Sequence, residues 1–563
     1  MDNHGLNMPG RPLHTNSGAL VIGGHFSQVR EDTIRHRDDF RLHCDGVPMS
    51  IANLREYFKN GRLFRDAARR RTRECFRPYQ QLYYSALHLY SLLRRNGFEV
   101  LLLNCHSTED PGRLELYSHN PHFVIISTTY MNMEAVRAVV ADVRTYLPES
   151  IIIVGGNYVH HSYLVWKKRN EPVYRDPAVL NRYFFTSDTP VTGVDFFIYD
   201  AHGERTLVAL IEGLCQGKDC SSLPNTICYR EGEITINREA SEEFAMDDYP
   251  VSWKTLPREL LSAVIPFSMT YGCPFSCGFC NFAKVSISRK SFEVVFQELR
   301  AIAALGIVQK IWFTDDNFLL TPAQVERFCR RFIDEGLPFT WMSFIRASSI
   351  TPRTAELMKK SGAELLILGL ESGSEKMLHA MRKRDTIAHY QQALSLLFAH
   401  DIDTELSFIF GYPGETDETA GETIDFINGL PYTDSQIPYL YLFKFNVAPL
   451  SPIFEEGERA RWKLEGSFLD YRHATMDSEQ VDAVLRRVAL ETVQPVFNYL
   501  DGIVHLEKKD LIRIMRARDT LARAVLAGGD PAAIASQWDS LEMLIGSHFG
   551  RKDLSAGRGQ MMQ

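Results

Sequence analysis

The stretch Tyr271–Phe282, YGCPFSCGFCNF, places Cys273, Cys277 and Cys280 within eight residues of a chain that has ten cysteines. A structural zinc site usually takes four ligands in paired spacings, whereas the spacing here is C-x3-C-x2-C and the next cysteine is the distant Cys329. Three thiolates on a tight loop also suit an iron–sulfur cluster that keeps one iron open. The motif therefore predicts either such a cluster or a zinc site with an open position.

Length and composition restrict the class of protein that can carry this motif. The chain has 563 residues, too many for one compact core, with 45% hydrophobic residues, 23% charged residues and a net charge of −8. This charge argues against nucleic-acid binding, and the absence of an apolar run of 18 residues argues against a membrane span. Residues 1–17 are polar and lack the apolar core of a signal peptide, so a flexible N-terminus and a cytoplasmic protein with reduced thiols are expected.

Apolar runs alternate with helical patterns on the N-terminal side of the motif. This alternation predicts an α/β domain with a doubly wound parallel sheet over residues 18–230, with an insertion at 27–78 and a linker at 231–260. Such sheets bind ligands at the carboxyl ends of their strands. The expected strands are ALVIGG (19–24), FEVLLLN (98–104), HFVIIST (122–128), SIIIVGG (150–156) and VDFFIYD (194–200).

A second βα series surrounds the cysteines and predicts a partial or full (β/α) barrel over residues 261–450. The expected first strand, SMTYG (268–272), would place the motif at the carboxyl edge of this barrel, where barrels carry their active sites. Residues 451–563 are charged and weakly patterned, and a mainly helical C-terminal region is expected there.

The motif CPFSCGFC resembles that of the radical SAM superfamily. Three later stretches resemble strands of its cobalamin-associated branch: IWFTDDNF (311–318), LLILGLESGSEKMLHAMRK (365–383) and FIFGYPGET (408–416). The resemblance implies a [4Fe-4S] cluster on the three cysteines, with S-adenosylmethionine (SAM) bound to the open iron and cleaved to a 5′-deoxyadenosyl radical. It further implies an electron donor such as flavodoxin or ferredoxin.

The order of the preceding strands resembles the cobalamin-binding domain that precedes many such barrels, although a flavodoxin-like domain without this ligand is the alternative. The axial-ligand motif D-x-H-x-x-G of other cobalamin proteins is absent, which leaves His25, after the first expected strand, as a candidate ligand of cobalt. The resemblance implies that cobalamin is contacted by residues at the strand ends, namely Ser127, Thr128, Thr129, Gly155, Gly156, Gly203 and Glu204.

Polar residues at the barrel strand ends are candidates for binding SAM or substrate. Asp316 is a candidate for the amino group or the ribose of SAM, Glu371 for its ribose hydroxyls, and Arg346 for its carboxylate or an anionic substrate. The alternatives are a capping turn for Asp316 and a structural ion pair for Arg346. His473, in a C-terminal YRHATM motif, is a candidate for substrate contact or proton transfer.

Together these resemblances imply a cobalamin-dependent radical SAM methyltransferase. Its reaction would methylate an unactivated carbon, or a phosphinate phosphorus, of a small-molecule or peptide substrate in specialised-metabolite or antibiotic biosynthesis. The alternative is an enzyme with the same cofactors that catalyses a rearrangement or an oxidative cyclisation. The sequence does not identify the substrate.

Overall fold

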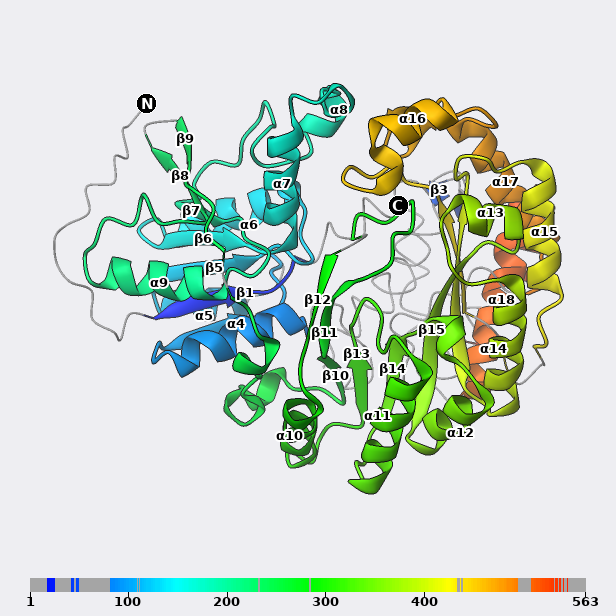
Figure 1. Cartoon of the computed structure of the whole chain (residues 1–563), viewed down its shortest axis with the longest axis horizontal. Helices are drawn as coiled ribbons and strands as arrows, with labels where there is room; N and C mark the ends of the chain where they lie inside the picture. The colour runs from blue at the N-terminus through cyan, green and yellow to red at the C-terminus, as the bar shows by residue number, and fades with distance from the viewer. Residues whose placement is uncertain are drawn as a thin grey trace.

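The computed structural model describes residues 18–25, 42–44, 47–49, 82–494 and most of 508–544; short gaps fall at 109, 111, 231–232, 242, 283–284, 433–435 and 437–438. The predicted flexible N-terminus lies outside the described residues, as does most of the predicted insertion. Figure 1 shows two β-sheets side by side, each with its own helices. Among the described residues, no helix combines the length and apolar character needed to cross a membrane.

The N-terminal sheet has seven strands in the order β4-β1-β5-β6-β7-β8-β9. The first five are parallel, and their order is that of a flavodoxin-like sheet, with the switch point between β1 and β5. This arrangement confirms the predicted doubly wound sheet. The strands are β1 (Ala19–Ile22), β4 (Val100–Leu103), β5 (Phe123–Ser127), β6 (Ile151–Gly155), β7 (Phe196–Ile198), β8 (Thr226–Arg230) and β9 (Glu233–Ile236).

Helices cover both faces of this sheet because its strands carry apolar side chains on both faces. Ala19 and Val21 pack in a core with α4 and α9, whereas Leu20 and Ile22 pack in a second core with α6 and α7. The antiparallel pair β8–β9 extends the sheet beyond residue 230, the predicted end of the domain. The helices are α4 (Tyr84–Arg95), α5 (Gly112–Ser118), α6 (Met133–Tyr146), α7 (Asn157–Lys168), α8 (Pro177–Leu180) and α9 (Glu204–Cys215).

The second sheet has six parallel strands in the order β10-β13-β14-β15-β16-β17. No pairing between β10 and β17 occurs among the described residues, so the sheet is a partial barrel. The strands are β10 (Val264–Phe267), β13 (Lys310–Phe313), β14 (Thr340–Phe344), β15 (Ala363–Glu371), β16 (Asp403–Phe410) and β17 (Tyr439–Lys444). The helices between them are α10 (Phe292–Ala303), α11 (Pro322–Asp334), α12 (Pro352–Lys360), α13 (Glu375–Ala380), α14 (Ile387–Ala399) and α15 (Asp417–Asn428).

The first barrel strand differs from the sequence prediction. It ends at Phe267, and the predicted strand 268–272 instead enters a two-stranded hairpin of β11 (Thr270–Cys273) and β12 (Val285–Arg289). The chain turns here because the Asp315 carboxylate accepts backbone hydrogen bonds from Met269 and Thr270. The cysteine motif therefore projects on a hairpin rather than following a barrel strand directly.

The described part of the C-terminal region consists mainly of helices and contains one short hairpin. After α16 (Glu456–Trp462) the chain forms the hairpin β18 (Glu465–Ser467) and β19 (Asp470–Arg472). The YRHATM motif begins in this hairpin. The helices α17 (Ser478–Glu491) and α18 (Lys508–Leu526) then follow along the outside of the barrel (Figure 1).

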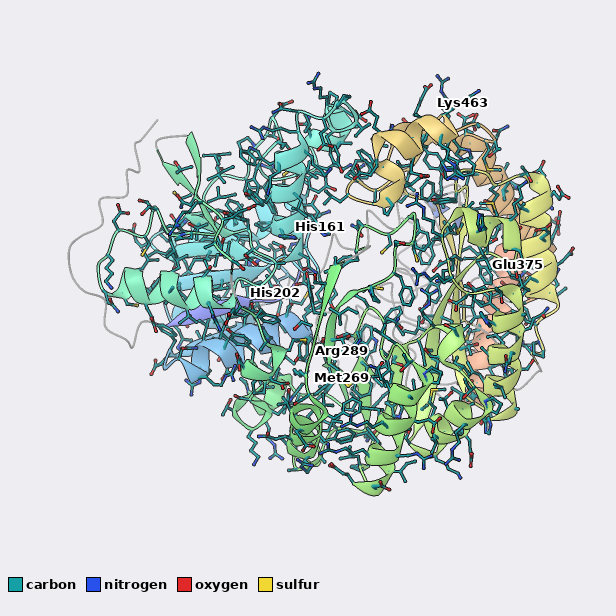
Figure 2. The ribbon with its side chains drawn as sticks, viewed as in Figure 1. His161, His202, Met269, Arg289, Glu375 and Lys463 are labelled. Atoms are coloured by element: carbon teal, nitrogen blue, oxygen red, sulfur yellow. The ribbon has the colours of Figure 1, made fainter. Side chains whose placement is uncertain are left out.

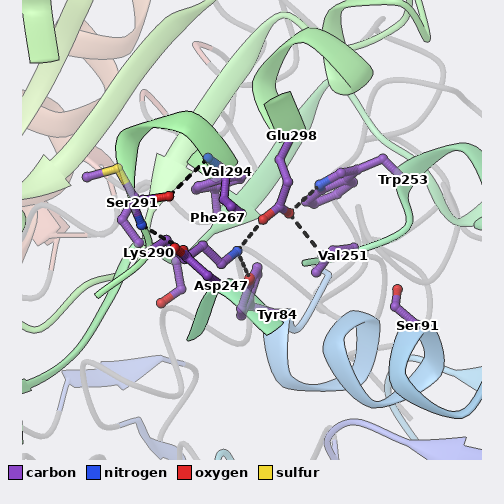
Figure 3. A network of polar contacts seen from close by, with 12 residues as sticks. Tyr84, Ser91, Asp247, Val251, Trp253, Phe267, Lys290, Ser291, Val294 and Glu298 are labelled. Atoms are coloured by element: carbon purple, nitrogen blue, oxygen red, sulfur yellow. Dashed lines mark hydrogen bonds and ion pairs between the residues drawn. The ribbon is translucent and has the colours of Figure 1, made fainter. Parts of the chain in front are cut away.

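A buried polar network joins the two units (Figure 3). The Lys290 ammonium, next to β12, donates to the Tyr84 hydroxyl of α4 at 2.8 Å and pairs with the Glu298 carboxylate of α10. Glu298 also accepts from the Trp253 indole at 2.9 Å and from the Val251 backbone at 3.1 Å. Because Lys290 directly follows the cysteine hairpin, this network fixes the base of the hairpin against the N-terminal unit.

Candidate functional site

The cysteine loop is held by its backbone, which leaves the thiols available. The N–H of Gly278 donates to the Met381 carbonyl at 2.8 Å, and the Gly278 carbonyl accepts from the N–H of Ile453 at 2.9 Å. Cys273, Cys277 and Cys280 are all free thiols, and Cys277 is buried. The loop is therefore anchored to chain segments that follow β15 and β17.

The arrangement of the thiols bears on the choice between zinc and a cluster. Within the part of the chain that the structure describes, no three His, Cys, Asp or Glu side chains gather closely enough to bind one metal ion, as a zinc site requires. In a four-iron cluster each thiolate binds a different iron, so these cysteines need not converge on one point. The donor set of three thiolates on one loop fits a cluster.

Gly278, between the second and third cysteines, has no room for a side chain. A Cβ atom there would lie 2.1 Å from the hydroxyl oxygen of Tyr412, far inside van der Waals contact. Tyr412 is itself buried in the GYPGE stretch after β16. The close approach of these residues positions the cysteine loop over the carboxyl end of the barrel.

We predict that Gly278→Ala displaces the loop and lowers the iron and sulfide content after anaerobic reconstitution at least about fivefold, because the buried Tyr412 ring has little room to move away from the added methyl group. Adding Tyr412→Phe removes the nearest atom and should restore part of the cluster. Gly457→Ala is the matched control, since no atom lies within 4 Å of a Cβ at that position. Full cluster content in Gly278→Ala would contradict the prediction.

Arg346, predicted as a SAM or substrate ligand, lies against the cysteine loop. Its guanidinium carbon is 3.9 Å from the ring centre of Phe275, which stands between Cys273 and Cys277. It also forms an ion pair with Asp385 at 2.7 Å, while its Nε is buried without a hydrogen-bond partner in the described chain. An unsatisfied cationic donor beside the cysteines fits an anionic group such as a carboxylate.

Asp315 and Asp316 follow β13 and have different roles. Asp315 is fully buried and accepts hydrogen bonds from Met269 and Thr270, and burial raises its pKa to about 7. Asp316 accepts a hydrogen bond from the Gly272 backbone next to the first cysteine, and burial raises its pKa as well. Asp315 therefore shapes the chain, whereas Asp316 faces the cysteine hairpin, as a SAM-binding role requires.

Glu371 ends β15 in a strained conformation. Its φ of +68° is in the left-handed region, which is unusual for a residue other than glycine. Its carboxylate pairs with the Lys383 ammonium at 3.0 Å, and both side chains are buried. The strain and the ion pair fix the carboxylate at the carboxyl edge of the barrel, where the sequence placed a SAM contact.

Both ring nitrogens of His473 form hydrogen bonds with backbone groups. Its Nδ1 accepts from the backbone N–H groups of Thr475 and Met476, at 3.3 and 3.4 Å, and its Nε2 therefore donates to the Gly411 carbonyl at 3.1 Å. Burial lowers its pKa, so the ring is neutral. These contacts indicate that His473 positions Gly411, rather than making the predicted substrate contact or proton transfer.

The candidate cobalamin residues lie together at the carboxyl edge of the N-terminal sheet, but not all point outward. The Thr128 hydroxyl donates to the Gly155 carbonyl at 2.9 Å, so Thr128 is structural. The hydroxyls of Ser127 and Thr129 lie 3.3 Å apart and bond to each other. Gly156 has a φ of +106°, and a Cβ there would lie 3.1 Å from the Thr128 nitrogen, so the strand end must be glycine.

Gly203 and Glu204 start α9 at the same edge. A Cβ at Gly203 would lie 2.5 Å from the Ile198 side chain, so this position also requires glycine. One Glu204 oxygen pairs with the His88 ring at 3.0 Å, and the other is buried without a partner in the described residues. An unsatisfied acceptor at this edge fits a ligand that carries amide N–H groups.

His25, the candidate axial ligand, is buried at the end of β1. Its ring stacks on that of His106 at 5.4 Å, and His106 in turn pairs with Asp142 at 2.8 Å. Burial lowers the pKa of His25 to about 4, so the ring is neutral, as a metal ligand must be.

The carboxyl edge of the N-terminal sheet meets the cysteine hairpin. The His202 ring, beside Gly203, lies 4.8 Å from that of Tyr271, and the His161 ring of α7 lies 5.5 Å from that of Phe282. Tyr130, three residues after Ser127, interacts electrostatically with Asp316. Figure 2 shows His161 and His202 between the N-terminal unit and the hairpin. Tyr130, His161 and His202 were missed as site residues because no local pattern distinguishes them from packed side chains.

Comparison with known proteins supports these observations. The family model of the Radical SAM superfamily matches residues 267–427. An uncharacterised methyltransferase of Pyrococcus horikoshii is 24% identical over 55% of this chain and 72% of its own length. An anaerobic magnesium-protoporphyrin IX monomethyl ester cyclase of Cereibacter sphaeroides is 31% identical, but the match covers only 31% of this chain and 29% of the cyclase.

Two solved structures share the fold of most of this chain. OxsB, a cobalamin-dependent SAM radical enzyme solved with aqua-cobalamin, aligns with 94% of this chain and 75% of its own at a TM-score of 0.56 and 15% identity. TsrM, a radical SAM methyltransferase of Kitasatospora setae, aligns with 78% of this chain and 75% of its own at a TM-score of 0.52 and 15% identity. Likeness at this identity establishes the two-unit fold. The match over residues 267–427 and the three cysteines at the carboxyl edge of the barrel identify a radical SAM domain in this chain, and such a domain implies a [4Fe-4S] cluster and SAM.

Proposed function

We propose that this chain is a cobalamin-dependent radical SAM methyltransferase. The observation that carries the proposal is the meeting of two edges: the ligand-binding edge of a flavodoxin-like sheet faces the hairpin that carries the three cysteines, through the pairs His202–Tyr271 and His161–Phe282. A flat cofactor bound at the first edge would thus lie next to SAM bound at the second. Both solved neighbours share this two-unit fold, and both are radical SAM enzymes.

Different residues of the chain would bind the three cofactors. Cys273, Cys277 and Cys280 would hold the cluster, and Asp316, Arg346 and Glu371 would orient SAM. Ser127, Thr129, Gly155, Gly156, Gly203 and Glu204 would contact cobalamin, with Thr128 supporting them from below. Cobalamin supplies a transferable methyl group, and the protein holds both cofactors and excludes water.

A second candidate function is a rearrangement or oxidative cyclisation with the same cofactors. The match to the magnesium-protoporphyrin IX monomethyl ester cyclase favours this second candidate. The substrate in either case would be a small molecule or peptide of a specialised pathway, such as antibiotic biosynthesis, with a flavodoxin or ferredoxin as electron donor and the cytoplasm as the setting.

The experiment that separates the two candidates is a product analysis of the reconstituted full chain with SAM, cobalamin and a chemical reductant. Extracts fractionated for methyl acceptors supply the substrate, and mass spectrometry follows the products. S-adenosylhomocysteine together with 5′-deoxyadenosine is expected for methyl transfer. 5′-Deoxyadenosine without S-adenosylhomocysteine would refute methyl transfer and support the second candidate.

A further inference from the structure

The residues of β16 alternate between partly exposed and buried along the strand. Leu406, Phe408 and Phe410 are fully buried on the outer face, where Phe408 meets Phe426 of the crossover helix α15 at 6.3 Å between ring centres. Alternation along the strand therefore turns Glu405 and its neighbours toward the interior. Residues at these alternate positions stay partly exposed although β15 and β17 flank β16 on both sides, so the exposed surface must face the interior.

The strand register places aromatic and aliphatic side chains around Glu405. Its paired residues are Ile367 on β15 and Tyr439 on β17, and Ile367 pairs in turn with Phe344 on β14. Because paired residues of parallel strands share a face, these side chains line one layer of the interior. Ile367 and Tyr439 are buried, whereas Phe344, the last residue of β14, is 37% exposed, so this layer is open on the side of β14.

The Glu405 carboxylate has no ion-pair partner among the described residues. Asp403, two residues earlier, pairs with Lys508 of α18 at 2.8 Å. The cations nearer the carboxyl edge are also engaged, since Lys444 bonds to Asp482 and Lys383 to Glu371. Burial raises the pKa of Glu405 to about 7. A carboxylate in such surroundings is stabilised by a cation that arrives from outside.

We propose that Glu405 binds the positively charged end of an elongated substrate inside the barrel. This inference rests on the proposed function, and it adds a substrate class: a molecule with an ammonium or similar cationic group. Ile409, near the strand end, is four positions after Glu405, a rise of about 13 Å. The cationic group would therefore lie roughly that far below the reacting atom, between aromatic walls that also favour a cation.

The test uses the reconstituted full chain with two probes of equal shape, benzylammonium and neutral benzyl alcohol, titrated by calorimetry. The wild type should prefer benzylammonium, and Glu405→Gln should weaken its binding at least about tenfold, as loss of a charge-assisted hydrogen bond requires. Benzyl alcohol binding should stay unchanged. Glu405→Asp, which retains the charge, should keep part of the preference.

Glu364→Gln is the matched control, because Glu364 is exposed on β15 and pairs with Lys310. It should bind both probes as the wild type does. Equal benzylammonium affinity in the wild type and Glu405→Gln, or no preference of the wild type for benzylammonium, would overturn the inference. SAM cleavage is measured on the same preparations: cleavage together with either of these results refutes the inference alone, whereas no cleavage by the wild type refutes the proposed function.

Discussion

Replacing Cys277 by alanine is expected to abolish SAM cleavage while leaving cobalamin binding intact. A cluster that lacks one of three protein ligands loses its anchor, and the electron needed for cleavage then has no route to SAM. The fall in 5′-deoxyadenosine formation should exceed about a thousandfold, because the uncatalysed reaction has no comparable pathway. Cobalamin should bind with wild-type affinity, since its candidate residues lie on a different sheet from the cysteine hairpin.

Cys220→Ala is the matched control, because Cys220 and Cys277 are both 8% exposed and the same atom is removed. It should retain the cluster, measured as iron content and visible absorbance, and the cleavage activity. Near-wild-type cleavage by Cys277→Ala would refute the assignment of the cysteines. Loss of cobalamin binding in the same variant would contradict the separation of the two sites.

The sequence predicted the parts of this fold that depend on local pattern. The alternation of apolar runs indicated both parallel sheets, and the cysteine spacing indicated the superfamily, because these signals are contained in short stretches. The start of the barrel was misplaced because Ser268–Gly272 has the composition of a strand. The distant Asp315 decides that the chain turns there, by binding the N–H groups of Met269 and Thr270.

The residues of the candidate site were predictable only where a short stretch of sequence fixes their position. Asp316, Arg346 and Glu371 do lie at the carboxyl edge, since the end of a parallel strand fixes where a residue must be. His473 has the residue type for proton transfer, but only the structure reveals that Gly411, Thr475 and Met476 occupy both ring nitrogens. Glu405 gave no signal, because an acidic residue in a strand usually faces solvent.

The buried polar network between the two units leads to a second prediction. Burial acts to lower the pKa of Lys290, but its interactions with Tyr84 and Glu298 outweigh this effect and raise it, so the ammonium stays charged. Lys290→Met leaves the Glu298 carboxylate buried without its cation. Breaking a buried pair in this way costs about 3–5 kcal/mol of the free energy of unfolding, which urea titration followed by tryptophan fluorescence would measure.

Two further variants distinguish a buried charge from a general packing defect. Lys290→Met combined with Glu298→Gln removes both charges and should recover a large part of the loss, because the amide oxygen still accepts from Trp253 and Val251. Arg300→Met breaks the pair with Glu335, in which Arg300 is half exposed, and should cost below about 1 kcal/mol. Equal losses in Lys290→Met and Arg300→Met would contradict the prediction. Because Lys290 follows β12, Lys290→Met should also release iron faster than the wild type. An unchanged rate of iron release would show that the network does not hold the cysteine hairpin.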